Sequence, residues 1–404
     1  MQQNLLKNII HPFFRIWIKC TTYFFFEKVI ITGKENIPSS GPVILACNHP
    51  DSFLDALLTT AYYKRPIYYL ARGDVFSSKL VSSILHFLNI IPIYRKEEGA
   101  IHFPKNESTF TFCIEAFKEN GTVLIFSEGG SENKWELRQL RKGTARLAYD
   151  AWHNNEIGTK LEILPVAIVY SGWMQLNTVA YLTFIKTITA KDLPDNIEHS
   201  LFLRKFNESL KISLYQNCLI IPRETHEELQ KILTGFLIKN KENGRALAAK
   251  AIENISNGSE TIKEKTILFA NYLKTHKLQY YSHRPSFISL IIGVLIIPFV
   301  YILNFLPYSL CTYLTKRLTH LNEFYDSVLF CLLLFFYPIY LLILFSIGLW
   351  LSHSLLFSVN LIILTLLTAK LNEWAKRNIY CFVNKEKMAT ISVMLHGLFG
   401  KDSD

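Results

Sequence analysis

The chain carries no Asp, Glu, Lys or Arg for 43 residues between Ser327 and Ala369. A helix of that length extends about 65 Å, which is enough for two crossings of a bilayer. A second uncharged run, Pro285 to Thr315, contains an apolar stretch from Ser286 to Leu306 that suffices for another crossing. The sequence therefore predicts an integral membrane protein, with a turn near Leu351-Ser352-His353-Ser354.

The first thirty residues do not have the pattern of a signal peptide. Arg15 and Lys19 interrupt the apolar stretch from His11 to Phe26, and no small-residue cleavage site follows. Aromatic residues interspersed with cations are typical of a helix lying in the membrane interface. The alternative is an ordinary helix packed on a folded domain.

A candidate catalytic stretch, Asn48-His49-Pro50-Asp51-Ser52-Phe53-Leu54-Asp55, follows the apolar run from Val43 to Cys47. The apolar run predicts a buried strand, and a helical pattern starts near Phe53. A histidine at such a turn can take a proton from a hydroxyl while a carboxylate orients its other ring nitrogen. The plain alternative is a solvated histidine at a helix cap.

Strand and helix patterns alternate from residue 29 to residue 200, which predicts an α/β domain. Functional groups follow the apolar strands at Ile90–Tyr94 and Val123–Phe126, as in open α/β sheets that bind ligands at the strand ends.

Four short blocks in this region resemble those of the glycerolipid acyltransferases. The first is the His49 and Asp55 pair, and the second is Ile91-Pro92-Ile93-Tyr94-Arg95. The third is Phe126-Ser127-Glu128-Gly129, and the fourth is Leu164-Pro165-Val166. Each block alone is a weak signal, but four in the family's order are a strong one.

The resemblance implies a role for each matched residue. His49 would be the general base, oriented by Asp55, and Arg95 would bind a phosphate. Glu128 and Gly129 would shape the acceptor site. The resemblance also implies a mixed sheet flanked by helices.

The chain departs from the family pattern at two points. Five residues separate His49 from Asp55 instead of four, so either Asp55 or Asp51 orients the imidazole; Asp55 fits the pattern better, and Asp51 could cap the helix. The third block lacks the usual arginine, and Arg141 or Lys142 could supply that charge. Both departures resemble the branch that acylates glycerol-3-phosphate or dihydroxyacetone phosphate.

The expected activity is transfer of a fatty acyl group from acyl-CoA or acyl carrier protein to a hydroxyl of a glycerol-phosphate acceptor, lysophosphatidate or glycerol-3-phosphate. The thioester donor is already activated, so we expect neither a covalent enzyme intermediate nor a cofactor, and no metal site is evident. Two alternatives stay open: an acyltransferase for a phosphate-free lipid hydroxyl such as an aminolipid, and a non-enzymatic membrane protein.

The amino-acid composition favours a lipid membrane as the binding partner of the chain. The formal net charge is +10, but the aromatic-rich apolar runs favour anionic lipid headgroups over nucleic acid. The seven cysteines form no closely spaced metal or redox pair, which fits a reducing compartment.

We predict five regions in the chain. They are an interfacial segment (1–28), a catalytic domain (29–200), a helical extension (201–283), a transmembrane region (284–370) and a polar tail (371–404). We expect the catalytic domain on the cytoplasmic side. Three spans would put the Lys/Arg-bearing tail on the opposite side, against the positive-inside rule, so two spans with a kinked or re-entrant segment near Pro298 are the alternative.

Overall fold

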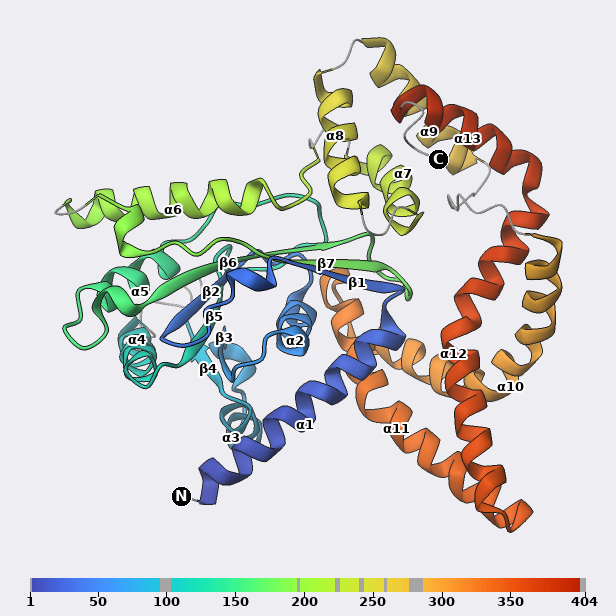
Figure 1. Ribbon diagram of the computed structural model, residues 1–404, viewed down its shortest axis with the longest axis horizontal. Helices are drawn as coiled ribbons and strands as arrows, with labels where there is room; N and C mark the ends of the chain where they lie inside the picture. The colour runs from blue at the N-terminus through green and yellow to red at the C-terminus, as the bar shows by residue number, and fades with distance from the viewer. Residues whose placement is uncertain are drawn as a thin grey trace. The chain divides into compact units, whose positions relative to one another are not determined.

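The structure is a computed structural model that describes residues 2–94, 103–194, 197–221, 226–239, 243–257, 260–275 and 286–399. The chain divides into two compact units (Figure 1). The first comprises Met1–Ile16, Ile31–Val169 and Tyr181–Cys218. The second comprises Trp17–Ile30, Tyr170–Ala180 and Leu219–Asp404.

A seven-stranded sheet has the strand order β1-β7-β6-β2-β5-β3-β4. Its strands are β1 (Lys28–Thr32), β2 (Val43–Cys47), β3 (Ile67–Arg72), β4 (Ile90–Ile93), β5 (Thr122–Phe126), β6 (Glu162–Tyr170) and β7 (Val179–Phe184). Helices lie on both faces of the sheet (Figure 1). The predicted α/β fold with a mixed sheet flanked by helices is therefore confirmed.

The centre of the sheet is parallel. β2 pairs in parallel with both β5 and β6, and β3 pairs in parallel with β5 and β4. All five residues of β2 are buried, as expected for a strand covered on both faces. β6 and β7 run antiparallel, because Ser171 N donates to Val179 O and Ile185 N donates to Pro165 O. The carboxyl ends of β2, β5, β3 and β4 consequently meet at one edge of the sheet.

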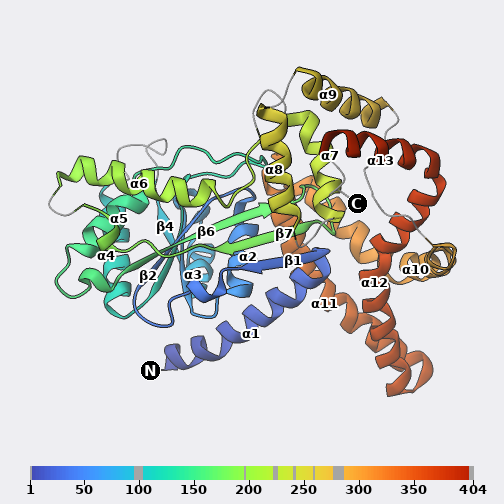
Figure 2. The same cartoon turned by 45° about the horizontal axis from the view of Figure 1, so that its top comes forward.

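The helices of the first unit include α2 (Ser52–Tyr62), α3 (Lys79–Phe87), α4 (Phe103–Lys118), α5 (Gly143–Trp152) and α6 (His199–Tyr215). The α6 helix lies beside α5 in both views (Figures 1 and 2). Phe202 and Phe206 pack their rings against Trp152 at centroid distances of 5.9 and 6.0 Å. The first compact unit therefore includes α6 and ends at Cys218.

The second unit contains the long apolar helices. These are α10 (Phe287–Leu318), α11 (Tyr325–Ser352) and α12 (Leu355–Val383), and by length and composition all three are candidate membrane spans. The predicted turn between the last two is present, with His353 in the left-handed conformation at φ 51°. Pro298 lies inside α10, which stays helical from Phe287 to Leu318.

The remaining helices of the second unit are α7 (His226–Lys239), α8 (Gly244–Asn257), α9 (Glu260–Thr275) and α13 (Lys385–Phe399). The α1 helix (Gln2–Phe25) contributes its last nine residues to this unit. There Trp17 contacts Phe335 and Phe25 contacts Phe330, with centroid distances of 5.8 and 5.2 Å. The aromatic end of α1 thus packs on α11.

Candidate active site

The turn after β2 carries His49, and Asn48 fixes that turn to the neighbouring strand. The Asn48 side chain donates to Ile168 O at 2.9 Å and accepts from Ile168 N at 2.7 Å. These two bonds extend the hydrogen-bond ladder between β2 and β6 by one position, with the side chain acting where the main chain of a strand residue would. Asn48 is buried, so the two hydrogen bonds satisfy its amide and hold the start of the turn in one conformation.

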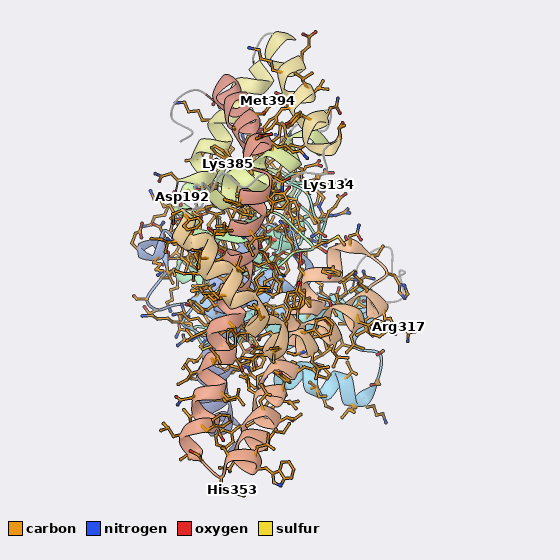
Figure 3. All side chains as sticks on the ribbon, turned by 90° about the vertical axis from the view of Figure 1, so that its right-hand side faces the viewer. Lys134, Asp192, Arg317, His353, Lys385 and Met394 are labelled. Carbon is orange, nitrogen blue, oxygen red and sulfur yellow. The ribbon has the colours of Figure 1, made fainter. Side chains whose placement is uncertain are left out.

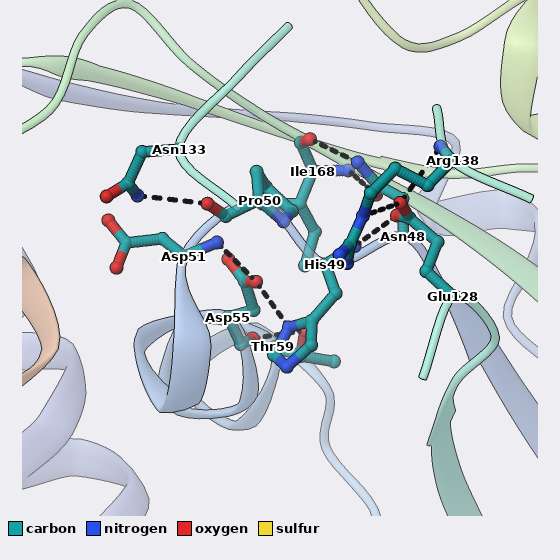
Figure 4. Close-up of polar contacts among 10 residues, drawn as sticks. All are labelled: Asn48, His49, Pro50, Asp51, Asp55, Thr59, Glu128, Asn133, Arg138 and Ile168. Atoms are coloured by element: carbon teal, nitrogen blue, oxygen red, sulfur yellow. Dashed lines mark hydrogen bonds and ion pairs between the residues drawn. The ribbon is translucent and has the colours of Figure 1, made fainter. Parts of the chain in front are cut away.

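Asp55, in the first turn of α2, binds the imidazole of His49 (Figure 4). Its Oδ2 atom lies 2.8 Å from His49 Nδ1 and also accepts from the Asp51 main-chain N at 2.9 Å. The carboxylate is fully buried. Asp51 occupies the N-cap position of α2. The widened spacing between His49 and Asp55 is therefore compatible with a direct contact, and Asp55 is the carboxylate that reaches the ring.

The His49 ring is also held from one face. It stacks on Phe126, the last residue of β5, with a centroid distance of 3.7 Å and an interplanar angle of 9°. Within the described part of the chain, no hydrogen bond engages His49 Nε2, and the side chain is 13% exposed. A carboxylate acceptor at Nδ1 fixes the proton there, so Nε2 carries the lone pair. The arrangement can accept a proton from a molecule entering at this edge of the sheet.

Glu128 ties the end of β5 to the histidine turn. Its Oε1 atom accepts from the His49 main-chain N at 2.7 Å. Its Oε2 atom accepts from both the main-chain N and Nε of Arg138 at 3.0 Å (Figure 4). With only 2% of its side chain exposed, this carboxylate is bonded to the protein at both oxygens. The geometry favours positioning of His49 over direct contact with an acceptor hydroxyl.

Arg138 is a member of the site that the sequence did not single out. The sequence offered one signal, the basic run containing Arg138, Arg141 and Lys142 after a third block that lacks its arginine. Arg138 Nη2 is buried and has no hydrogen-bond partner among the residues that the structure describes. The guanidinium beside Glu128 thus comes from ten residues further along the chain.

Arg141 lies over Gly129 and has an exposed side chain. Gly129 adopts φ +71°, and a Cβ atom there would lie 2.9 Å from Arg141 Cγ. The Arg141 main-chain N donates to Ser127 O at 2.7 Å, which closes the loop between β5 and α5. The glycine is therefore required twice, by its backbone conformation and by the close approach of Arg141. Lys142 occupies the N-cap position of α5.

Arg95 falls outside the described residues. The strand that precedes it, β4, ends at Ile93 at the same sheet edge as β2 and β5. The phosphate-binding role of Arg95 stays a prediction.

Cys47, the thiol nearest to the site in the chain, is fully buried. Burial and, to a smaller extent, the negative charge of Asp55 raise its pKa well above the usual value. A neutral, buried thiol is a poor nucleophile. The site therefore presents an oriented base without an activated cysteine beside it.

Comparison with known proteins connects this geometry to a family. Residues 28–169, which hold the β2 turn, Asp55 and Glu128, match the profile of the family described as Acyltransferase. This part of the chain is similar to the acyltransferase family. The resemblance predicted from the four sequence blocks is thereby confirmed.

The chain is also similar to individual acyltransferases. The chain is 23% identical over 168 residues to the chloroplastic 1-acyl-sn-glycerol-3-phosphate acyltransferase of Arabidopsis thaliana, covering 41% of this chain and 42% of the relative. It is 25% identical over 154 residues to the 1-acyl-sn-glycerol-3-phosphate acyltransferase of Borreliella burgdorferi, covering 38% and 56%. The chain thus spans about half the length of the curated relatives it matches.

Among solved structures, the 1-acyl-sn-glycerophosphate acyltransferase from Thermotoga maritima matches 52% of this chain and 81% of its own, with a TM-score of 0.38 and 19% identity.

Proposed function

We propose that this protein transfers a fatty acyl group from a thioester to a hydroxyl of a glycerol-phosphate acceptor, as a step of phospholipid synthesis. The observation that carries the proposal is the His49 Nδ1 to Asp55 Oδ2 contact of 2.8 Å within the acyltransferase domain. The acceptor class follows from the relatives, whose names describe acylation of 1-acyl-sn-glycerol-3-phosphate.

In the proposed reaction, His49 Nε2 takes the proton of the acceptor hydroxyl as its oxygen attacks the thioester carbon. Asp55 stabilises the imidazolium that forms and keeps the ring oriented. The tetrahedral intermediate then collapses with cleavage of the C–S bond. The leaving thiolate takes the proton back from His49, so the base is regenerated and the products are an ester and a free thiol.

Glu128 acts in this scheme as a positioning residue, because both of its oxygens are bonded to His49 N and Arg138. A phosphate monoester needs a cation, and a guanidinium can bind it with two parallel hydrogen bonds. Arg95 is the proposed phosphate ligand, and the exposed Arg141 is the second candidate. We further propose that the catalytic domain faces the cytoplasm, where both acyl-CoA and acyl carrier protein are available.

The experiment is an acyl-transfer assay on the purified protein in detergent. Radiolabelled acyl-CoA and acyl carrier protein are each offered with lysophosphatidate, glycerol-3-phosphate, dihydroxyacetone phosphate and a phosphate-free aminolipid. Product with a phosphate acceptor is expected, and the His49→Ala variant should form none. Activity only on the aminolipid would refute the acceptor class, and wild-type rates in His49→Ala would refute the mechanism.

A further inference from the structure

The α11 and α12 helices form an antiparallel hairpin whose open end adjoins the loop between β6 and β7. In that loop, Met174 N donates to Asp326 Oδ2 at 2.7 Å, and Asn177 O accepts from Arg377 Nη2 at 2.9 Å. At the other end the helices touch closely, since a Cβ on Gly348 would lie 3.1 Å from Ser358 Oγ. The loop residues continue directly into β6 and β7. The open end of the hairpin is therefore bound to the loop that joins β6 to β7.

Figure 3 shows His353 at the far end of this hairpin, with Lys385 toward the opposite end and Arg317 between them. The hairpin presents apolar side chains outward along its length. Their exposed fractions lie between 39% and 67% for Phe335, Ile339, Leu342, Ile343, Leu364 and Leu367. An apolar surface of this length suits the interior of a bilayer.

The first part of α10 runs along α12 in the opposite direction. A Cβ on Gly293 would lie 3.4 Å from Ala375 O. Eleven residues later, Asn304 Nδ2 donates to Thr368 Oγ1 at 2.9 Å and to Thr365 O at 3.3 Å. This part of α10 therefore descends from the open end of the hairpin toward its middle.

A straight continuation of α10 is incompatible with the chain that follows. From Asn304 it would bring Leu318 to the level of the hairpin tip, about 36 Å from the level of Asp326 at 1.5 Å per residue. The eight residues from Leu318 to Asp326 reach at most about 28 Å when fully extended. They are also shortened by the 3₁₀ turn Asn322–Phe324. The helix must therefore turn back before it reaches the tip.

The structure contains that turn. Pro298 and Pro307 both lie inside α10, where each proline removes a helical hydrogen bond and favours a kink. The ribbon of α10 bends strongly (Figure 1). Just after Pro307, the Tyr308 ring lies under Lys376, with Nζ 5.9 Å from the ring centre. Lys376 is next to Arg377, so the chain is again near the open end of the hairpin.

From these contacts we infer that α10 is a re-entrant helix, which enters and leaves the bilayer on the side of the acyltransferase domain. The α11–α12 hairpin crosses the bilayer, and the tail beginning at Lys385 is on the same side as the catalytic domain. The partner of the apolar surface is the bilayer interior. This inference deepens the proposed membrane association and does not depend on the proposed acyl transfer.

The charges on α12 agree with this topology. Lys370 Nζ donates to the Tyr23 and Phe26 carbonyls at 2.6 and 2.8 Å, at the end of α1, and lies 4.4 Å from the centre of the Tyr23 ring. Such acceptors satisfy an ammonium at the boundary of the apolar core. With the tail on the cytoplasmic side together with the catalytic domain, its cations obey the positive-inside rule.

The test is cysteine accessibility in the full-length protein in sealed vesicles. The exposed native Cys20 is replaced by serine, and single cysteines are introduced at His320, His353 and Lys385. Arg204→Cys, on α6, reports the side of the catalytic domain. A membrane-impermeant maleimide is applied before and after permeabilisation, so the readout needs no enzymatic activity.

We expect His320→Cys and Lys385→Cys to react from the same side as Arg204→Cys, and His353→Cys from the other side only. Three crossings would invert all three results, placing His320 and Lys385 opposite Arg204 and His353 beside it. That pattern would overturn the inference. A His353→Cys variant that reacts from neither side would show that the hairpin does not cross, which also overturns it.

Discussion

Glu128 Oε1 accepts a hydrogen bond from the main-chain N of His49 at 2.7 Å, so the residue after β5 fixes the backbone of the residue after β2. These two strands are neighbours in the sheet, with Cys47 in register with Phe126. The contact couples the orientation of the proposed base to a buried carboxylate that is itself held by Arg138.

Glu128→Gln should therefore lower both activity and stability. The amide can still accept from His49 N, but it leaves the Arg138 guanidinium without a counter-charge. We expect a loss of about 1–3 kcal/mol in the free energy of unfolding and at least about a tenfold loss in the acyl-transfer rate. Thermal melting in detergent and initial rates measure the two effects. Glu132→Gln is the control, since its ion pair with Lys134 is exposed; equal effects of the two substitutions would contradict the coupling.

Asp55→Asn should impair transfer by roughly 10²–10⁴-fold. An asparagine can donate to Nδ1, which moves the ring proton to Nε2 and removes the lone pair that accepts the hydroxyl proton. The variant should bind acceptor normally, so kcat should fall much more than KM rises. Asp51→Asn is the matched control, because Asp51 contacts the Asp55 carboxylate through its main-chain N, which the substitution keeps. A larger effect at Asp51 would reverse the assignment.

Gly129→Ala should destabilise the loop that carries Glu128. An alanine there meets Arg141 Cγ at 2.9 Å and must also adopt φ +71°. The backbone contribution alone is about 1–2 kcal/mol. Gly158→Ala separates the two causes, because Gly158 has φ +47° but no atom of the described residues lies within 4 Å of the added Cβ. Chemical denaturation should show a larger loss at Gly129, and equal losses would mean that the Arg141 contact relaxes freely.

Arg95→Ala should weaken binding of a phosphate acceptor. The loss of charge-assisted hydrogen bonds is worth roughly 1.5–3 kcal/mol, or about 10- to 150-fold in affinity. Arg95→Lys should recover only part of this, because an ammonium does not reproduce the planar fork. The measurement is KM for the acceptor at saturating acyl donor. An unchanged acceptor dependence would exclude a phosphate-binding role.

The raised pKa of Cys47 predicts a pH effect on stability. The folded state keeps the thiol protonated at a pH where the unfolded chain already ionises it, near 9. The stabilisation is therefore complete below pH 9 and is lost as the pH rises above it. Cys47→Ala should remove this part of the alkaline destabilisation while retaining acyl transfer. If the free energy of unfolding falls equally steeply with pH above 9 in the two proteins, the stability prediction is wrong. If Cys47→Ala folds but no longer transfers acyl groups, the thiol is needed for catalysis.

Local patterns were enough to predict much of the fold and part of the site. The apolar run Val43–Cys47 is a strand with the same bounds in the structure, because continuous burial leaves a strong signal. The choice of Asp55 over Asp51 as the partner of His49 came from the family resemblance, because the spacing alone left both carboxylates open. The partnership of Arg138 with Glu128 could not be predicted, since the loop between them has no periodicity that relates sequence distance to position in space.

Local sequence patterns could not predict the path of α10, for a related reason. Pro298 and Pro307 indicate that the helix can bend, but they do not determine in which direction. The direction depends on Thr365 and Thr368, more than sixty residues further along the chain, which bind Asn304.

The Asn304 amide also constrains the order in which the membrane region assembles. It is buried, and its partners are Thr365, Thr368 and the Tyr337 hydroxyl, which donates to Oδ1 at 2.6 Å. All three are synthesised after α10. An unpaired amide in hydrocarbon costs several kcal/mol. An α10 that enters hydrocarbon before the hairpin exists leaves this amide without its partners, so α11 and α12 complete the environment of a helix that is synthesised before them.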